Sequence, residues 1–184
     1  MERRICHSGG AEGADVYFAQ YALQNQCDVV HYSYKTSFHS HSFKHELTAE
    51  EFNEGAAQLQ KISNQLKRFL YKPYVNLLSR NYFQIKKSKQ VFAVGFLEKD
   101  ESGSLCRVKG GTGWTIQMAI NAEREIYVFD QKNEEWFKWN NQLKRFVVCE
   151  LPKITTQHFA GIGTRKINLF GIQAIEALFE NSFK

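Results

Sequence analysis

The sequence has few of the features that mark secreted, membrane-spanning or metal-binding chains. Its four cysteines, Cys6, Cys27, Cys106 and Cys149, show no C-x-x-C spacing, so neither a zinc site nor a disulfide framework is expected. No apolar run approaches the ~20 residues of a membrane span, and the opening residues lack the apolar core of a signal peptide. We therefore expect a soluble, cytoplasmic protein with reduced thiols and no membrane partner.

A long basic tract is also missing, although the chain is basic overall. Lys and Arg number 24 against 19 Asp and Glu, and the pI is about 9.0. The basic residues stand in small groups such as 86–89 and 144–145, without the interleaved basic and aromatic run of many nucleic-acid binders. This balance favours an anionic partner, with nucleic acid less favoured than a small molecule.

Residue patterns for metal binding and nucleophilic catalysis are not found either. His39, His41 and His45 lie in a polar segment without the helical H-x-x-x-H spacing of many zinc sites. Ser8 follows His7, but neighbours on a strand point to opposite sides and cannot pair as nucleophile and base. From these patterns we expect no metal, no cofactor and no catalytic residue.

The apolar residues that are present alternate between strand-like and helical spacing. With 184 residues and 43% hydrophobic content, the chain is long enough for one core. The pattern predicts one Rossmann-like α/β domain over 1–184, with a mostly parallel sheet flanked by helices. The expected strands are 3–7, 27–34, 90–97, 125–130 and 157–162, and the expected helices are 14–22, 48–70, 74–85, 114–122 and 172–179. Residues 98–109 are expected to form a loop or hairpin and 145–151 an edge strand.

Three glycine-rich segments lie at the ends of these elements. SGGA (8–11) follows the first expected strand, GGTG (110–113) precedes the helix expected at 114–122, and GIGTR (161–165) lies at the end of the last expected strand. Glycine permits a sharp turn and close approach of a ligand, and the free N–H groups of a helix start attract anions. Loops that leave the carboxyl ends of parallel strands share one edge of the sheet. The segments therefore predict a pocket for a phosphate or ribose; the alternative is that the glycines only make tight turns.

The same segments resemble a known superfamily. SGGAEGAD (8–15) is similar to the signature of the SLOG superfamily of Rossmann-like domains. SRNYFQIKKSKQVFAVGF (79–96) is similar to a helix and strand of its DNA-processing protein A branch, and VKGGTGWTIQMAI (108–120) to a segment of its LOG phosphoribohydrolases. FAGIGTRKINLFG (159–171) resembles a strand and loop that stand first in most relatives, which implies a circularly permuted order.

The resemblance implies a pocket for a nucleotide-like ligand. Arg165 is the expected charge clamp, because a guanidinium can bind a phosphate with two parallel hydrogen bonds. Trp114 is expected to stack on a base or to pack in the core, and Arg80 with Asn81 to enter the site or to tie their helix to the sheet. The predicted ligand contacts are Ser8, Gly9, Gly10, Ala11, Asp15, Arg80, Asn81, Gly110, Gly111, Thr112, Gly113, Trp114, Gly163, Thr164 and Arg165.

One departure from the resemblance bears on enzyme activity. LOG phosphoribohydrolases carry adjacent glutamates where this chain has Ile116 and Gln117, and a neutral amide cannot act as the carboxylate. LOG-type glycosidic hydrolysis is therefore disfavoured, unless Asp15 or Asp130 substitutes for the missing carboxylate.

The leading hypothesis is a binding protein that senses or sequesters a nucleotide-derived small molecule, such as an ADP-ribose derivative. A free-standing chain of this kind could act as an anti-defence sponge for an immune signal. The alternatives are a nucleotide N-glycosidase and a single-stranded DNA-binding protein. By the same resemblance, a homo-oligomer is expected.

Overall fold

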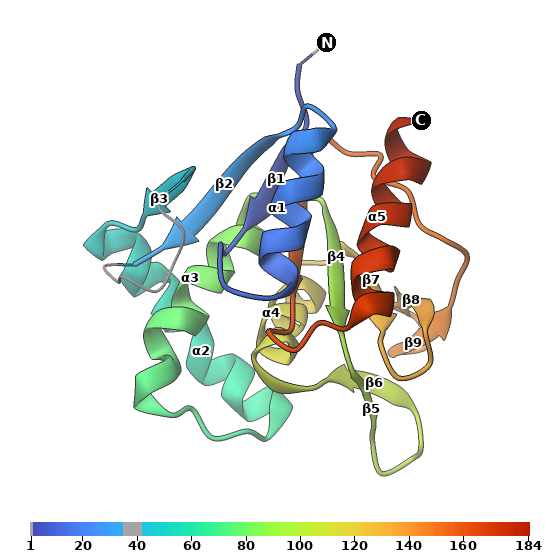
Figure 1. Cartoon of the computed structure of the whole chain (residues 1–184). Helices are drawn as coiled ribbons and strands as arrows, with labels where there is room; N and C mark the ends of the chain where they lie inside the picture. Colours follow the sequence, from blue (N-terminus) through green and yellow to red (C-terminus); the bar gives the residue numbers. More distant parts are fainter. Residues whose placement is uncertain (1, 35–41) are drawn as a thin grey trace.

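A largely parallel sheet forms the centre of the computed structural model, which describes residues 2–34 and 42–184 (Figure 1). Within those residues the sheet has eight strands in the order β3-β2-β1-β10-β4-β7-β8-β9. The first six pair in parallel, and β8 and β9 extend the sheet in antiparallel fashion. The strands are β1 (Ile5–Ser8), β2 (Asp28–Ser33), β3 (Lys44–Glu46), β4 (Gln90–Gly95), β7 (Glu125–Asp130), β8 (Glu135–Asn140), β9 (Arg145–Val148) and β10 (His158–Gly163).

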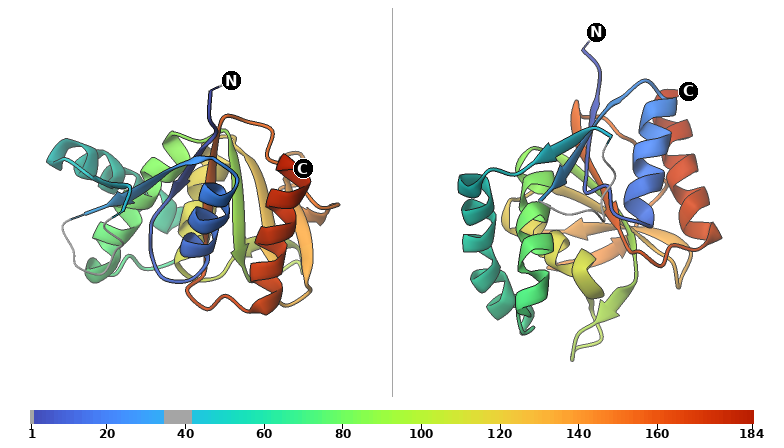
Figure 2. Two further views of the ribbon diagram at one scale, coloured as in Figure 1. Left: turned by 45° about the horizontal axis from the view of Figure 1, so that its top comes forward. Right: turned by 60° about the vertical axis from the view of Figure 1, so that its left-hand side comes forward.

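Helices cover both faces of the sheet (Figure 2). Helices α1 (Ala14–Gln24) and α5 (Leu169–Phe183) pack on one face, and α3 (Val75–Lys86) and α4 (Gly110–Asn121) on the other, where α2 (Ala49–Leu66) packs against them from outside. Strand β4 serves both layers, since Phe92 and Val94 face α1 and α5 while Val91 and Ala93 face the other helices. A strand buried on two faces is apolar throughout. The predicted fold class, an α/β Rossmann-like domain with a mostly parallel sheet, is confirmed.

The last strand in sequence lies in the middle of the sheet. β10 pairs with β1 on one side and with β4 on the other. The two ends of the described chain are neighbours: Arg4 Nη1 donates to the carbonyl oxygen of Ser182 at 3.4 Å, and the Arg4 guanidinium lies 4.7 Å from the Phe183 ring centre. In Figure 1 both termini lie at the top, opposite the edge at which β4, β1 and β10 end.

Helix α2 begins where the sequence predicts and ends earlier. Glu51 N donates to Thr48 Oγ1 at 3.2 Å and Thr48 N to Glu51 Oε2 at 3.0 Å, which is the predicted capping box. The helix stops at Leu66, because Lys67 adopts a left-handed conformation (φ 52°) and Arg68 N closes back onto the Ser63 carbonyl oxygen at 3.1 Å. The prediction that it runs to residue 70 is wrong, and residues 67–71 form a connector before the short 3-10 helix η1 (Lys72–Tyr74).

Two further segments refine the sequence-based expectations. Residues 97–108 form a hairpin of β5 (Leu97–Lys99) and β6 (Leu105–Val108), and β9 is an edge strand as expected. The GGTG segment is not a turn before a helix at Trp114. It is the first turn of α4, with Lys109 as the residue before it. Within the described ranges, no helix has the length and apolarity needed to cross a membrane.

Candidate functional site

A cleft of about 1330 Å³ opens at the carboxyl edge of the sheet. Its walls come from the loop after β1, one face of α3, the start of the β5–β6 hairpin, the first turn of α4 and the loop after β10. The connector between α2 and α3 closes one side. The loops after β1 and β10 meet here because parallel strands end at the same edge, and the β5–β6 hairpin after β4 brings the start of α4 to the same place, so the three glycine segments meet as predicted.

Most of the predicted contact residues line this one cleft. They come from four separate stretches of sequence, so the fold alone brings them together. The residues are Ala11, Asp15, Arg80, Asn81, Gly110, Gly111, Thr112, Trp114, Gly163, Thr164 and Arg165.

Four predicted residues do not line the cleft. Ser8 is fully buried, and its hydroxyl donates to the Asp15 carbonyl oxygen at 3.3 Å. At Gly9 a Cβ would stand 1.3 Å from Arg80 Nη1, and at Gly10 2.9 Å from the His31 ring. At Gly113 it would stand 2.0 Å from the Val108 carbonyl oxygen. The protein's own atoms fill the space that a side chain at these glycines would take, so the glycines permit close packing.

A buried ion pair lies beneath the loop after β1. Arg80 Nη1 lies 3.8 Å from Asp15 Oδ2, and the Arg80 side chain is only 2% exposed. Gly9 N donates to Asp15 Oδ2 at 3.2 Å. The Gln84 amide, oriented by its hydrogen-bond partners, places its oxygen 2.8 Å from Arg80 Nη1 and 2.9 Å from Gly9 N. The Asp15 carboxylate therefore accepts the hydrogen bond from Gly9 N, a backbone donor that we predicted from the sequence to bind a phosphate or ribose.

Burial and charge act in opposite directions on this pair. Burial raises the pKa of the Asp15 carboxyl, while the Arg80 guanidinium and the backbone N–H groups of Ala11, Gly9 and Gly163 act against that rise. Burial likewise lowers the pKa of Arg80, and the Asp15 charge opposes this. Arg80 Nε has no hydrogen-bond partner among the described residues. Arg80 lies at the wall of the cleft, but its side chain is almost fully buried and its charge is paired with Asp15, so it supports the loop after β1 from beneath.

The first turn of α4 offers a second set of donors. Lys109 precedes the helix without a side-chain cap, and the first turn holds no acidic residue. The first N–H groups of a helix have no partner within it, and the helix dipole favours an anion there. A Cβ at Gly110 or Gly111 would meet nothing within 4 Å, so a ligand can approach this backbone closely.

The charge of the cleft is positive. Among the described residues that line it, six side chains are cationic and three acidic. Two of the acids are engaged, Asp15 by Arg80 and Glu98 by Arg68, whose Nη2 lies 2.7 Å from Glu98 Oε2. The cationic lining side chains without an ion pair in the described part of the chain are Lys109, Lys132, Arg165 and Lys166.

Other residues singled out in the sequence have structural roles. Trp114 is 6% exposed and packs in the core cluster of α2–α4, so it offers the cleft little ring surface. Asn81 Nδ2 donates to Thr115 Oγ1 at 2.8 Å. Ile116 is buried in the same core, and Gln117 donates to Asn121 Oδ1 at 3.1 Å.

Asp130, the second carboxylate considered as a substitute, is buried outside the lining of the cleft. Its Oδ1 accepts from Leu97 N at 3.0 Å and its Oδ2 from Asn133 Nδ2 at 2.7 Å. Both oxygens are therefore occupied in holding the turns after β4 and β7.

Sequence reasoning missed two features of the site. Gly13 adopts φ 99°, and a Cβ there would lie 2.5 Å from Arg165 Cα, so this glycine lets the loops after β1 and β10 pack together. The other feature is an exposed aromatic group on the connector, formed by Phe69, Tyr71 and Tyr74. The signal was visible as three aromatic residues around Pro73, but the apolar spacing through residue 70 was interpreted as helix.

A chain of polar rings lies on the α3 side of the sheet. His7 Nε2 lies 3.0 Å from His158 Nδ1, and His7 Nδ1 lies 3.2 Å from the Tyr32 hydroxyl. Burial, together with the nearby His158 and Lys87, lowers the pKa of His7 to about 4. His7 thus points away from Ser8, as expected for neighbours on a strand.

This shift predicts a pH-dependent loss of stability. The unfolded chain protonates His7 near its ordinary pKa of 6.5, whereas the folded chain resists protonation down to about pH 4. Stability is therefore full above the first value and falls between the two, by about 3 kcal/mol. We expect the free energy of unfolding of His7→Asn, measured with urea, to fall less than that of the wild-type protein across this pH range, because the variant has no imidazole to protonate. An identical pH dependence in the two proteins would remove His7 as its source.

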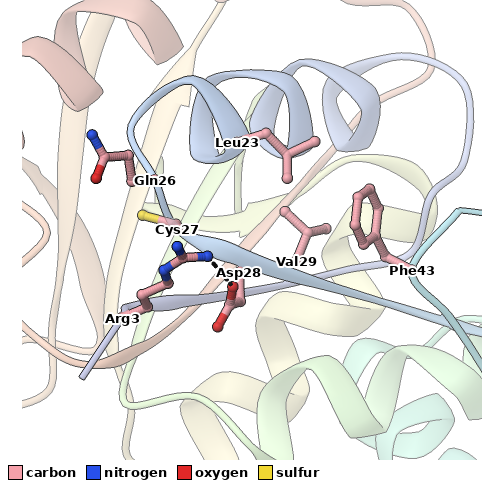
Figure 3. Close-up of a pocket in the computed structure, with 7 residues that line it drawn as sticks. All are labelled: Arg3, Leu23, Gln26, Cys27, Asp28, Val29 and Phe43. Atoms are coloured by element: carbon pink, nitrogen blue, oxygen red, sulfur yellow. Dashed lines mark ion pairs between the residues drawn. The ribbon is translucent and has the colours of Figure 1, made fainter.

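A second, smaller hollow of about 510 Å³ lies near the amino end of β2 (Figure 3). Leu23, Val29 and Phe43 form its apolar side, and Arg3 pairs with Asp28 at 3.5 Å at the other end. The pair is exposed and contributes little stability. The hollow contains no predicted contact residue, so the cleft at the carboxyl edge is the candidate site.

A metal centre is not formed by the described residues: no group of three or more His, Cys, Asp or Glu side chains is arranged to hold an ion. His39 and His41 lie outside the described residues. In comparisons with known proteins, no family model, curated protein or solved structure matches this chain. The function is therefore inferred from the site.

Proposed function

We propose that this protein binds a nucleotide-derived small molecule, such as an ADP-ribose derivative, in the cleft at the carboxyl edge of its sheet. Sensing and sequestration both require such binding. The observation that carries the proposal is that the start of α4, which has no side-chain cap, and the Arg165 guanidinium, which has no ion pair in the described part of the chain, line one cleft. Backbone donors at a helix start together with guanidinium groups are a chemistry suited to phosphate.

The topology supports the resemblance to the SLOG superfamily on which the proposal draws. In the order of the relatives, the segment from β10 to α5 would run directly into β1, so the permuted order requires that the two ends of this chain lie close together. β10 is central although it is last in sequence, and Arg4 contacts Ser182 and Phe183 near the other end of the chain. These features are the ones that the permuted order requires.

Binding without cleavage fits the acidic residues better than glycosidase chemistry does. Of the three acids that line the cleft, Asp15 is held by Arg80 and Gly9, and Glu98 by Arg68. A general acid or base must reach the reacting atom and exchange a proton with it. Glu12 remains as the one lining carboxylate without an ion pair in the described part of the chain, and it stands exposed on the loop after β1.

Arg165 provides the direct test. A ligand that binds only the folded chain stabilises it by about 2.7 kcal/mol at a concentration of 100 times its Kd. ADP-ribose is expected to raise the melting temperature of the wild-type protein, and Arg165→Ala is expected to weaken binding about tenfold or more, since it removes charge-assisted hydrogen bonds. The measurement is a thermal unfolding titration with AMP, ADP and ADP-ribose.

Arg145→Ala is the matched control, because Arg145 is an exposed arginine on β9 outside the cleft. It is expected to leave the titration unchanged. If Arg145→Ala and Arg165→Ala weakened ligand binding equally, the loss would be due to the change in overall charge and not to a contact at Arg165. If no nucleotide shifted the melting temperature of the wild-type protein, the proposal would be abandoned.

A further inference from the structure

The connector between α2 and α3 presents aromatic rings to solvent. Phe69, Tyr71 and Tyr74 are 75%, 60% and 56% exposed, and all three line the same cleft as the cationic loops. Phe69 and Tyr71 meet edge to face, with ring centres 4.9 Å apart. Rings in such contact have few rotamers to lose when a ligand arrives, so they form a preorganised surface.

The side chain of Arg68 fixes this surface next to the helix start. Its Nη2 donates to Glu98 Oε2 at 2.7 Å and to the Val108 carbonyl oxygen at 3.2 Å, and its Nη1 donates to the Gly110 carbonyl oxygen at 3.2 Å. Phe69 therefore follows directly after a residue that is bonded to the first residue of α4. The aromatic surface and the anion-binding turn are neighbouring parts of one cleft.

We propose that Phe69, Tyr71 and Tyr74 form a stacking subsite for the base of the bound nucleotide, while its phosphate groups lie at the start of α4 and at Arg165. This inference rests on the proposed function and specifies the ligand class: a molecule with an anionic group at one end and a planar aromatic ring at the other. Base stacking on exposed aromatic side chains is strong and tolerates different bases. A cleft of about 1330 Å³ has room for more than a ribose phosphate.

The test compares ligands with and without a base. ADP-ribose is the base-bearing probe, and ribose 5-phosphate and pyrophosphate are the probes without a base. In isothermal titration, Phe69→Ala and Tyr71→Ala are each expected to raise the Kd of ADP-ribose about tenfold. The same variants are expected to change the Kd of the two base-free probes less than about twofold, since those probes make no stacking contact.

Phe170→Ala is the control, because Phe170 is an exposed aromatic residue on α5 outside the cleft. Equal losses for base-bearing and base-free probes would overturn the stacking subsite and leave the anion site standing. If Phe69→Ala altered self-association in size-exclusion chromatography and left the ADP-ribose Kd unchanged, the rings would be an interface between copies, and the subsite would also fall. Absence of any binding by the wild-type protein would overturn both the subsite and the proposed function.

Discussion

Replacing Arg80 with methionine is expected to lower the free energy of unfolding by about 3–5 kcal/mol, the usual cost of removing one partner from a buried ion pair. The Asp15 carboxyl would then lose the nearest opposite charge while remaining buried. Folding would have to protonate Asp15, whose pKa burial already raises. The measurement is urea unfolding of Arg80→Met against the wild-type protein at neutral pH.

The pH dependence of the loss in stability, together with a second variant, tests whether the buried charge of Asp15 causes it. A carboxyl with a raised folded-state pKa stabilises the fold fully below its unfolded pKa of about 3.9 and loses that contribution as pH rises. The penalty in Arg80→Met is therefore expected to be larger at neutral pH than in acid. Adding Asp15→Asn removes the uncompensated charge and is expected to recover more than about 1 kcal/mol. A penalty below about 0.5 kcal/mol would mean that Arg80 is solvated in the native protein.

Alanine at Gly113 is expected to destabilise the fold by about 3 kcal/mol, whereas alanine at Gly111 is expected to change stability by no more than about 1 kcal/mol. A Cβ at Gly113 would lie 2.0 Å from the Val108 carbonyl oxygen, a backbone atom of the β5–β6 hairpin that cannot move alone. At Gly111 it would meet nothing within 4 Å. Chemical denaturation of the two variants measures the difference.

The pair is a matched control, since the two glycines stand two positions apart in one helix turn and receive the same substitution. Gly111 lines the cleft and Gly113 does not. Gly111→Ala is therefore expected to weaken ligand binding in a protein of normal stability. Equal destabilisation by both substitutions would contradict the division of GGTG into a ligand-facing part and a packing part.

Much of the fold could be predicted from local patterns. The continuous apolar run of β4 predicts that the strand is buried on two faces, and Thr48 with Glu51 predicts the start of α2. The end of α2 could not be predicted in the same way, because the apolar spacing continues to Leu70 although Lys67 adopts a left-handed conformation. The Arg68 side chain, which holds the connector that follows, bonds to Glu98, Val108 and Gly110, which are distant in sequence.

The sequence was sufficient to predict which loops form the candidate site, but not which atoms of those loops face a ligand. That the segments after β1 and β10 share an edge follows from parallel strand order, whereas GGTG reaches that edge through the antiparallel β5–β6 hairpin. Which glycines face a ligand depends on what fills the space above them. At Gly9 it is the Arg80 guanidinium, supplied by a helix some seventy residues later in the sequence. The exposed position of Phe69, Tyr71 and Tyr74 could not be predicted either, because the contacts of Arg68 that hold the connector join residues distant in sequence.

The most direct test of the account is to incubate the purified protein with a mixed panel of nucleotides, dinucleotides and ADP-ribose derivatives and to analyse retained and released fractions by mass spectrometry. We expect an intact base-bearing compound to be retained by the wild-type protein and by Arg145→Ala and to be lost from Arg165→Ala. Release of free base would instead identify a glycosidase. No retained compound, together with single-stranded DNA binding that weakens steeply as salt rises, would contradict the small-molecule site and make nucleic acid the ligand.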